Sequence, residues 1–268
     1  SVVKLVSRAR REGIHLTPRQ VFNAKCIANL VKELHEVDPL GGSQNSKTVS
    51  HDTNDKGQLT STLLMQRYLN AATPLDRFAQ LASVVVPESM TAIELKELVY
   101  ALLNRHGLLR AQLVQSCTGE LSLNVPVENT QTIYCEQTYQ QCDDNKYRVY
   151  SESADLPTLE NSGVLSAAEL AKQLCSNLSP ENGVMVAVLL VKENENNNQR
   201  AWFAINHLVI DVSSWHILAE DLAIVRSQQV SNEKLELPPV PTSWRSWSNH
   251  INKLSQQYIP APNLTNLG

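Results

Sequence analysis

The chain has 268 residues, of which 42% are hydrophobic, and a formal net charge of −4, so it is long enough for one large domain or for a domain plus a fragment. The acidic balance, with no stripe of lysine and arginine between aromatic residues, argues against a nucleic-acid partner. No apolar stretch reaches the roughly 20 residues that cross a bilayer, and the N-terminus lacks the pattern of a secretory signal, so we expect a cytoplasmic protein with no membrane partner.

The five cysteines are an odd number and show no C-x-x-C spacing. Neither a zinc site nor a disulfide framework is therefore indicated. We expect no bound metal, and we expect reduced thiols at Cys26, Cys117, Cys135, Cys142 and Cys175.

Residues 1–37 carry the apolar spacing of three short helices. Thr17 and Pro18 give the second of them a capping hydroxyl and a first-turn proline. Roughly 40 residues bury too little apolar surface to hold a core alone, so we expect these helices to be the tail of a larger unit. The side chains expected on the buried faces of the second and third helices are Val21, Phe22, Ile27, Leu30, Val31 and Leu34.

Residues 5–11 and 13–22 closely resemble the second half of a peptidyl carrier domain of nonribosomal peptide synthetases. In that family a G-G-x-S motif comes just before this helix, and its serine carries phosphopantetheine. The resemblance places the modified serine before Ser1, outside the chain, and implies that Ser1 itself is a helix residue. Residues 38–57 contain turn formers and almost no large apolar side chain, which predicts a linker.

Residues 58–258 predict one larger domain after this linker. Residues 59–70 have helical spacing, and residues 81–87 predict a strand that is stopped by a proline. A further strand is predicted over residues 108–114.

A helix is predicted between these two strands, from about Met90 to Arg105. Thr91 and Glu94 have the spacing of a capping box at its start. The apolar face expected for this helix consists of Ile93, Leu95, Leu98, Ala101 and Leu102.

The end of this helix resembles an early motif of the condensation-type domains of the same synthetases, R-H-x-x-L-R, which is matched by Arg105, His106, Leu109 and Arg110. Residues 77–80 are similar to the family's h-F-N-Q element. A histidine and an arginine in a helix-to-strand turn more often bind carbonyls and carboxylates than perform catalysis. We therefore expect structural roles for His106 and Arg110.

The segment from residue 117 to residue 180 indicates no function, although residues 167–174 predict a short helix. Residues 184–191 predict a strand that is buried on both faces, and so do residues 201–205. The polar run between these strands predicts a hairpin tip, so we expect the two to pair antiparallel.

Residues 206–215 follow the second buried strand, where we expect the chain to leave the core at Asn206 and His207. This run resembles the H-H-x-x-x-D-G signature of condensation and epimerization domains, which share the chloramphenicol-acetyltransferase type of fold. The resemblance implies an α/β (α+β) lobe with a central mixed sheet and flanking helices, preceded by a small helical carrier-domain fragment. Asn206 replaces the first histidine of the signature, and Val212 replaces the glycine.

The resemblance places His207 at the second histidine, the catalytic or substrate-positioning residue, and Asp211 at the aspartate, which mainly holds the turn. A neutral imidazole accepts a proton from an amine or from the α-carbon of a thioester. The alternative is that His207 is a packed histidine at the end of a strand. An asparagine at 206 does not titrate near neutral pH, and a valine at 212 would be strained if the backbone there had positive φ.

Ser214 and Trp215 make the signature resemble D-G-V-S-W, which is typical of epimerization domains, and residues 216–222 and 237–247 also resemble that class. The implied reaction inverts the α-carbon of an aminoacyl or peptidyl thioester on a phosphopantetheinylated carrier domain. It requires acid and base groups on opposite faces of that carbon.

Family members have two lobes, and the resemblance covers only about residues 58 to 250, with residues 259–268 as a tail. We therefore expect this chain to lack turnover without a C-terminal lobe or neighbouring synthetase modules. The alternatives are a condensation-type domain, an inactive lobe that serves as a carrier-docking or structural module and, less favoured, a free acyltransferase acting on coenzyme A esters.

Overall fold

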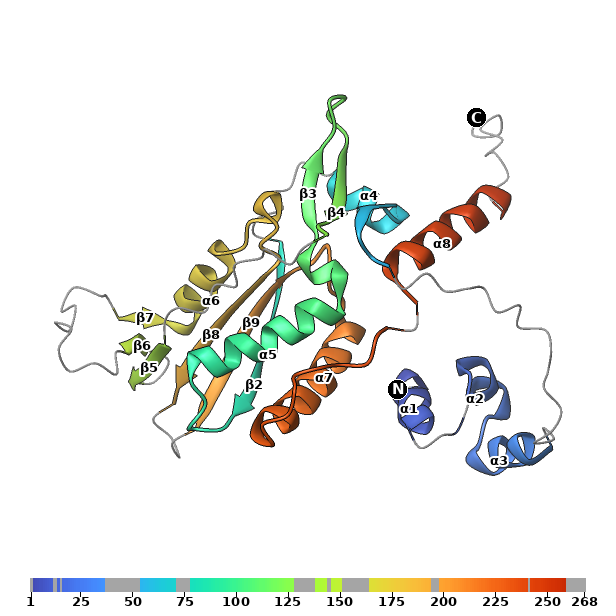
Figure 1. The fold of residues 1–268 in the computed structure, drawn as a ribbon, viewed down its shortest axis with the longest axis horizontal. Helices are drawn as coiled ribbons and strands as arrows, with labels where there is room; N and C mark the ends of the chain where they lie inside the picture. Colours follow the sequence, from blue (N-terminus) through green and yellow to red (C-terminus); the bar gives the residue numbers. More distant parts are fainter. Residues whose placement is uncertain are drawn as a thin grey trace, which may run out of the picture. The chain divides into compact units, whose positions relative to one another are not determined.

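A computed structural model of the chain describes residues 2–11, 14, 16–36, 54–70, 78–127, 138–143, 146–150, 164–193, 198–240 and 242–258. The chain divides into two compact units, residues 1–50 and residues 51–268 (Figure 1). The division falls inside the segment expected to be a linker. Ser1, residues 38–53 of that linker, Arg77 and the tail lie outside the described residues.

The described part of the first unit forms the three expected helices, α1 (Val2–Arg11), α2 (Pro18–Ala24) and α3 (Ile27–Glu36). Thr17 caps α2 as predicted, because its hydroxyl accepts a hydrogen bond from the Gln20 backbone N–H, and the Gln20 side chain accepts one from the Thr17 backbone N–H. The core of the unit consists of Ala9, Leu16, Ala24 and Leu30. The prediction was wrong for Phe22, Ile27 and Val31, which are exposed, because a unit this small covers only one narrow stripe of each helix.

In the second unit, six of the described strands form one sheet in the order β2-β9-β8-β5-β6-β7. Their bounds are β2 (Ala79–Val86), β9 (Gln199–Asn206), β8 (Val186–Lys192), β5 (Thr138–Asp143), β6 (Lys146–Tyr150) and β7 (Leu165–Ser166). Strands β5 and β8 are parallel and the other neighbours are antiparallel. The expected central mixed sheet and the antiparallel pairing of β8 with β9 are confirmed.

Helices cover both faces of this sheet (Figure 1). On one face, Phe203 and Ile205 of β9 pack in the same core as α5 (Ala92–Arg105) and α7 (Val212–Val230). On the other face, Ala204 packs with the buried leucines of α6 (Ala167–Ser176). Burial on both faces explains the nearly continuous apolar sequence of β8 and β9.

Three further described strands, β1 (Gly57–Leu59), β4 (Leu121–Val125) and β3 (Gln112–Gln115), form a second, antiparallel sheet. The short helix α4 (Leu63–Leu69) and the longer α8 (Trp244–Tyr258) complete the unit, together with two 3-10 turns, η1 (Gly107–Arg110) and η2 (Pro180–Asn182).

Two predicted boundaries in this unit were wrong. Leu59 lies in β1 and α4 begins only at Leu63, because the Thr62 hydroxyl accepts a hydrogen bond from the Met65 backbone N–H and caps the helix there. The strand expected over residues 108–114 begins at Gln112, after η1. The capping box at Thr91 is confirmed, whereas Ile93, which follows it, is exposed.

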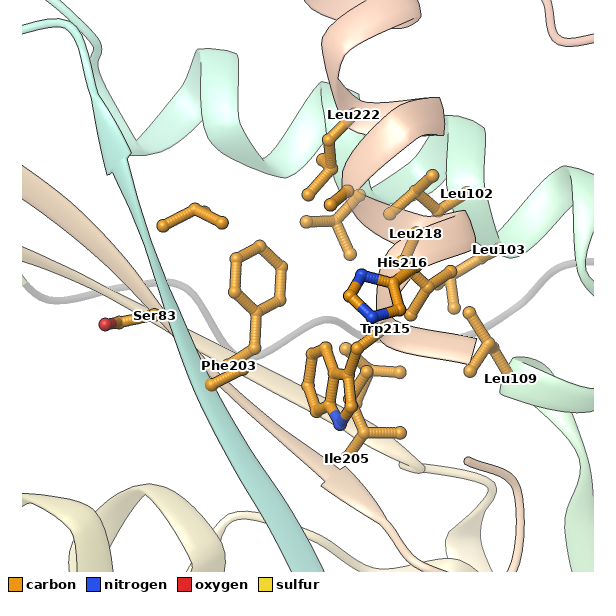
Figure 2. A pocket seen from close by; sticks show the side chains of 15 residues that line it. Ser83, Leu102, Leu103, Leu109, Phe203, Ile205, Trp215, His216, Leu218 and Leu222 are labelled. Carbon is orange, nitrogen blue, oxygen red and sulfur yellow. The ribbon is translucent and has the colours of Figure 1, made fainter. Parts of the chain in front are cut away.

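An apolar cavity of about 210 Å³ lies between the sheet and the two helices α5 and α7. Its walls include Phe203, Ile205 and Trp215, with Leu218 and Leu222 of α7 above them (Figure 2). Protein interiors contain few voids larger than a water molecule, and this cavity is much larger than one. Its volume leaves room for an added apolar side chain.

Replacing Ala219, which lines this cavity, by leucine is expected to raise the free energy of unfolding by about 1–2 kcal/mol. Ala219 is itself exposed, so only part of the added carbons would be buried in this apolar space, at about 0.8 kcal/mol for each methylene. Chemical denaturation measures the change. Ala223→Leu is the matched control, because Ala223 lies on the same helix and is exposed like Ala219, but it does not line the cavity. Equal effects of the two substitutions would contradict the prediction.

Candidate functional site

The signature run begins inside the core. Asn206 is the last residue of β9 and is completely buried, and Leu208, Val209 and Ile210 are buried as well. The Asn206 side-chain Oδ1 accepts a hydrogen bond of 3.0 Å from the Leu208 backbone N–H. The prediction that the chain leaves the core at Asn206 was therefore wrong, because this hydrogen bond turns the chain back over the end of the sheet.

His207 is half-buried, and both its backbone and its ring have partners. Its backbone N–H donates to the carbonyl oxygen of Phe78 at 2.7 Å, and its ring stacks on the Phe78 ring with 4.8 Å between centroids. Its Nδ1 lies 2.9 Å from the carbonyl oxygen of Ile210, and its Nε2 lies 3.0 Å from Nε2 of Gln80. The rings of Phe78 and Tyr68 contact each other in turn.

Trp215 reaches the same cluster from α7. Its indole N–H donates to the side-chain oxygen of Gln80 at 2.8 Å. Gln80 lies on β2 opposite Ile205 of β9, so its side chain shares the face of the sheet that α7 covers. Sequence reasoning missed this role for Gln80, and its place in the h-F-N-Q-like element was the one signal that could have indicated it.

Asp211 is the N-cap of α7. Its carboxylate accepts hydrogen bonds from the Ser214 backbone N–H at 2.7 Å and from the Ser214 hydroxyl at 2.6 Å. These bonds, that of the hydroxyl first, lower the pKa of Asp211 below the ordinary 3.8. The carboxylate therefore stabilises the start of the helix rather than taking part in proton transfer near neutral pH.

Val212 is the first residue of α7 and is exposed. Among the residues that the structure describes, Lys25 and Asn232 are the non-glycine residues with positive φ. Val212 therefore does not have the positive φ at which a valine would be strained, because it follows the cap at Asp211 with helical backbone geometry.

Asp211→Ala is expected to lower the free energy of unfolding by about 1 kcal/mol at pH 7, the usual cost of losing an N-cap. The folded pKa lies below the unfolded one, so the ionised group stabilises the fold above pH 3.8 and this contribution is lost as the pH falls through the folded pKa. Denaturation of both proteins between pH 2.5 and 7 follows the difference, which is expected to shrink at the acidic end. Asp211→Asn, which keeps a capping oxygen, serves as the control, and a loss equal to that of the alanine variant would refute the capping role.

The residues of the early motif form a buried ion-pair network at the end of α5. Arg105 Nη1 lies 2.9 Å from Asp221 Oδ1, and His106 Nε2 lies 2.7 Å from Asp221 Oδ2. Asp221 belongs to α7 and is only 4% exposed. Arg105 and His106 thus fasten α5 to the helix that carries Asp211, Ser214 and Trp215.

Arg110 is buried and donates hydrogen bonds to the carbonyl oxygens of Leu103 and Pro126, at 3.1 and 3.0 Å. Burial lowers the pKa of its guanidinium, which Asp55 partly offsets. Its contacts agree with the structural role expected for this residue, because they join the side chain to α5 and to the residue that follows β4.

A pocket of about 640 Å³ opens beside His207. Arg105, His106, His207, Asp211 and Ser214 line it, so the fold brings together five of the eight residues singled out from the sequence. Trp215 lines the smaller apolar cavity instead. Asn206 and Arg110 are not among the residues that line the apolar cavity or the larger pocket.

Asp55 also lines the larger pocket and was missed in the sequence, where it belongs to the expected linker. Burial raises the pKa of its carboxyl above 3.8, against the opposing effect of a hydrogen bond from the Arg245 backbone N–H. That bond joins Asp55 to the first turn of α8. Gly107 allows Asp55 to lie close to the backbone of residue 107, because a Cβ on that residue would lie 2.7 Å from the Cβ of Asp55.

Among the described residues, no group of three histidine, cysteine, aspartate or glutamate side chains has the arrangement to hold a metal ion. No helix in the described part of the chain is both long and apolar enough to cross a membrane. Cys26, Cys117 and Cys175 are free thiols.

Comparisons with known proteins agree with this fold. The family described as Condensation domain matches residues 77–259. A linear gramicidin synthase polypeptide from Brevibacillus parabrevis is 26% identical over 252 residues, which are 94% of this chain and 4% of that protein. Bacitracin synthase 3 from Bacillus licheniformis is 24% identical over 259 residues, which are 93% of this chain and 4% of that protein. The chain therefore spans only a small part of the length of these relatives.

Two solved structures are similar to this chain at low identity. The epimerization domain from the third module of tyrocidine synthetase B has a TM-score of 0.58 at 20% identity, over 75% of this chain and 42% of that one. The first condensation domain of the CDA synthetase has a TM-score of 0.54 at 10% identity, over 76% of this chain and 46% of that one. The chain spans less than half of either solved chain, and the likeness shows the fold, including the expected chloramphenicol-acetyltransferase type of lobe.

Proposed function

The chain belongs to the condensation-domain family, and we propose that it works within a nonribosomal peptide synthetase as part of an epimerization-type domain. Its substrate is an aminoacyl or peptidyl group carried as a thioester on the phosphopantetheine arm of a carrier domain. The reaction inverts the α-carbon of that group by removing a proton and returning one.

The position of His207 carries this proposal. The ring lies in the wall of a pocket of about 640 Å³, which has room for an acyl group and the end of a pantetheine arm. The pocket wall is mainly apolar, with Leu64, Ile217 and Trp247 among its exposed members. An imidazole in a water-poor site is suited to accept a proton from a carbon next to a thioester carbonyl.

His207 supplies one of the two acid/base groups that inversion requires. Asp211 stays ionised as a helix cap, and Asp55 is engaged by the backbone of α8. We therefore assign the second group to another segment of the parent protein, on the opposite side of the substrate. The pattern at Ser214 and Trp215 favours epimerization over condensation.

Mass spectrometry of a carrier domain loaded with an aminoacyl-pantetheine arm tests the proposal, with the chain present in its parent polypeptide. In D2O, epimerization places deuterium at the α-carbon and gives both stereoisomers. Amide formation with a second loaded carrier, without deuterium uptake, would replace the proposal by the condensation alternative. Carrier binding with neither reaction would overturn the catalytic proposal in favour of a docking module.

A further inference from the structure

We propose that Gln80 is a positioning residue for His207. Its carboxamide, anchored by Trp215, holds the histidine in one neutral tautomer and occupies the proton-accepting nitrogen until substrate displaces it. The catalytic consequence rests on the function proposed above, whereas the tautomer itself does not.

Trp215 determines the orientation of the Gln80 amide. An indole N–H is a donor only, and the Trp215 N–H lies 2.8 Å from the amide oxygen of Gln80. The reversed amide would point its NH2 group at another donor. Gln80 therefore presents its NH2 group to His207, across the 3.0 Å to Nε2.

The two partners of His207 then fix its protons. The Ile210 carbonyl is an acceptor only, so the Nδ1 atom that lies 2.9 Å from it carries hydrogen and donates. Nε2 faces the NH2 group of Gln80 and must accept. Both bonds exist together only in the neutral ring with its proton on Nδ1 and its lone pair on Nε2.

The surrounding packing leaves little freedom to this arrangement. Gln80 lies on β2, His207 follows β9 and Trp215 lies on α7, so three separate elements meet here. Phe78 stacks on the imidazole, and the Trp215 ring is a wall of the apolar cavity (Figure 2). A turn of the Gln80 side chain alone would free Nε2, with the imidazole left in place.

Such a motion couples substrate binding to the availability of the base. When Gln80 moves away, Nε2 takes the proton from the α-carbon, whose bonding electrons pass into the enolate of the thioester. The imidazolium formed keeps its Nδ1 bond to Ile210. A proton on Nε2 with Gln80 still in place would set two donors against each other.

Nitrogen-15 spectra of the histidine rings test the tautomer without any substrate. The signal of His207 is identified by its loss in His207→Gln, and it is expected to show a protonated Nδ1 and an unprotonated Nε2. Gln80→Glu places a carboxylate acceptor against Nε2, so both nitrogens are expected to carry protons at pH 7. Trp215→Phe releases the Gln80 amide, and Gln80→Met removes it. In each variant, the share of His207 rings that carry both protons at pH 6.5 is expected to be at least twofold larger than in the wild type.

Trp244→Phe is the matched control, because it removes the indole N–H of a tryptophan for which no bond to Gln80 exists in this structure, and the His207 signals should not move. A wild-type ring protonated on Nε2 would overturn the proposal. Spectra of Gln80→Glu and Gln80→Met that match the wild type would do so as well.

Deuterium exchange separates this inference from the proposed function. If the inference and the proposed function are both right, Gln80→Met changes the pH profile of deuterium exchange. Gln80→Glu suppresses exchange at neutral pH, because the His207 ring in that variant already carries both protons. The expected tautomer without any exchange would sink the proposed function and leave the role of Gln80 intact. Exchange together with a ring that is protonated on Nε2 would support the proposed function and overturn the role of Gln80.

Discussion

Replacing Asp221 by asparagine is expected to lower the free energy of unfolding by about 3–5 kcal/mol, the usual cost of removing one partner from a buried ion pair. The carboxylate of Asp221 faces both Arg105 and His106, and all three side chains are mostly shielded from water. An amide at this position returns only part of the hydrogen bonding and none of the charge. The guanidinium of Arg105 would then remain buried without its counterion.

Chemical denaturation at pH 7 measures this loss, and an exposed ion pair provides the comparison. Lys234 and Glu236 form a bridge of 2.8 Å in which both side chains are largely exposed. Glu236→Gln is expected to cost less than about 1 kcal/mol, because solvent screens such pairs. A similar, small cost at both positions would show that the network at Asp221 does not anchor α7.

The anchoring of α7 matters for the site because this helix begins with the residues around His207. Its first turn contains Ser214 and Trp215, and its N-cap is Asp211. A shift of the helix would move the indole that holds Gln80. The early motif at Arg105 and His106 therefore serves the site from a distance, through the position of α7 rather than through contact with a substrate.

Local signals in the sequence predicted the elements that local chemistry determines. The capping boxes at Thr17 and Thr91 mark the starts of α2 and α5, because side-chain caps act within three residues. The apolar runs that became β8 and β9 were equally readable, since burial on both faces favours a nearly continuous apolar sequence. The strands β5 and β6, with their mixed polar sequences, gave no comparable signal.

Contacts between distant segments set the features that the sequence did not reveal. Gln80 meets Trp215 across 135 positions of chain, and no spacing rule connects the two. The bonds of Arg110 to Leu103 and Pro126 likewise join segments that meet only in the folded chain. Phe22 looked like a core residue because helical spacing shows which residues share a face, but not whether another element covers that face.

The two departures from the signature acquire different meanings in the structure. Asn206 supplies a side-chain acceptor to the backbone of the following turn and is buried on a strand end, so it acts as a structural residue there. Val212 occupies a helical position that tolerates any ordinary side chain. Neither replacement disturbs the hydrogen bonds of His207, which are made to Gln80, Ile210 and the backbone of Phe78.

His207→Gln is therefore expected to reduce deuterium exchange at the substrate α-carbon by about 10²–10⁴-fold, the usual contribution of a general base. Glutamine retains a polar side chain but has no nitrogen that takes up a proton near neutral pH. Initial rates measured with a saturating loaded carrier isolate the chemical step from carrier binding.

Asp211→Asn is the control for this experiment, since it keeps the helix cap and leaves the imidazole in place. Its exchange rate is expected to stay within about threefold of the wild type if the aspartate only caps α7. Undiminished exchange in His207→Gln would instead make this histidine a packed residue at the end of a strand and move the search for the base to other groups of the pocket. Exchange lost in both variants would indicate that the turn as a whole, and not the imidazole, is what the reaction requires.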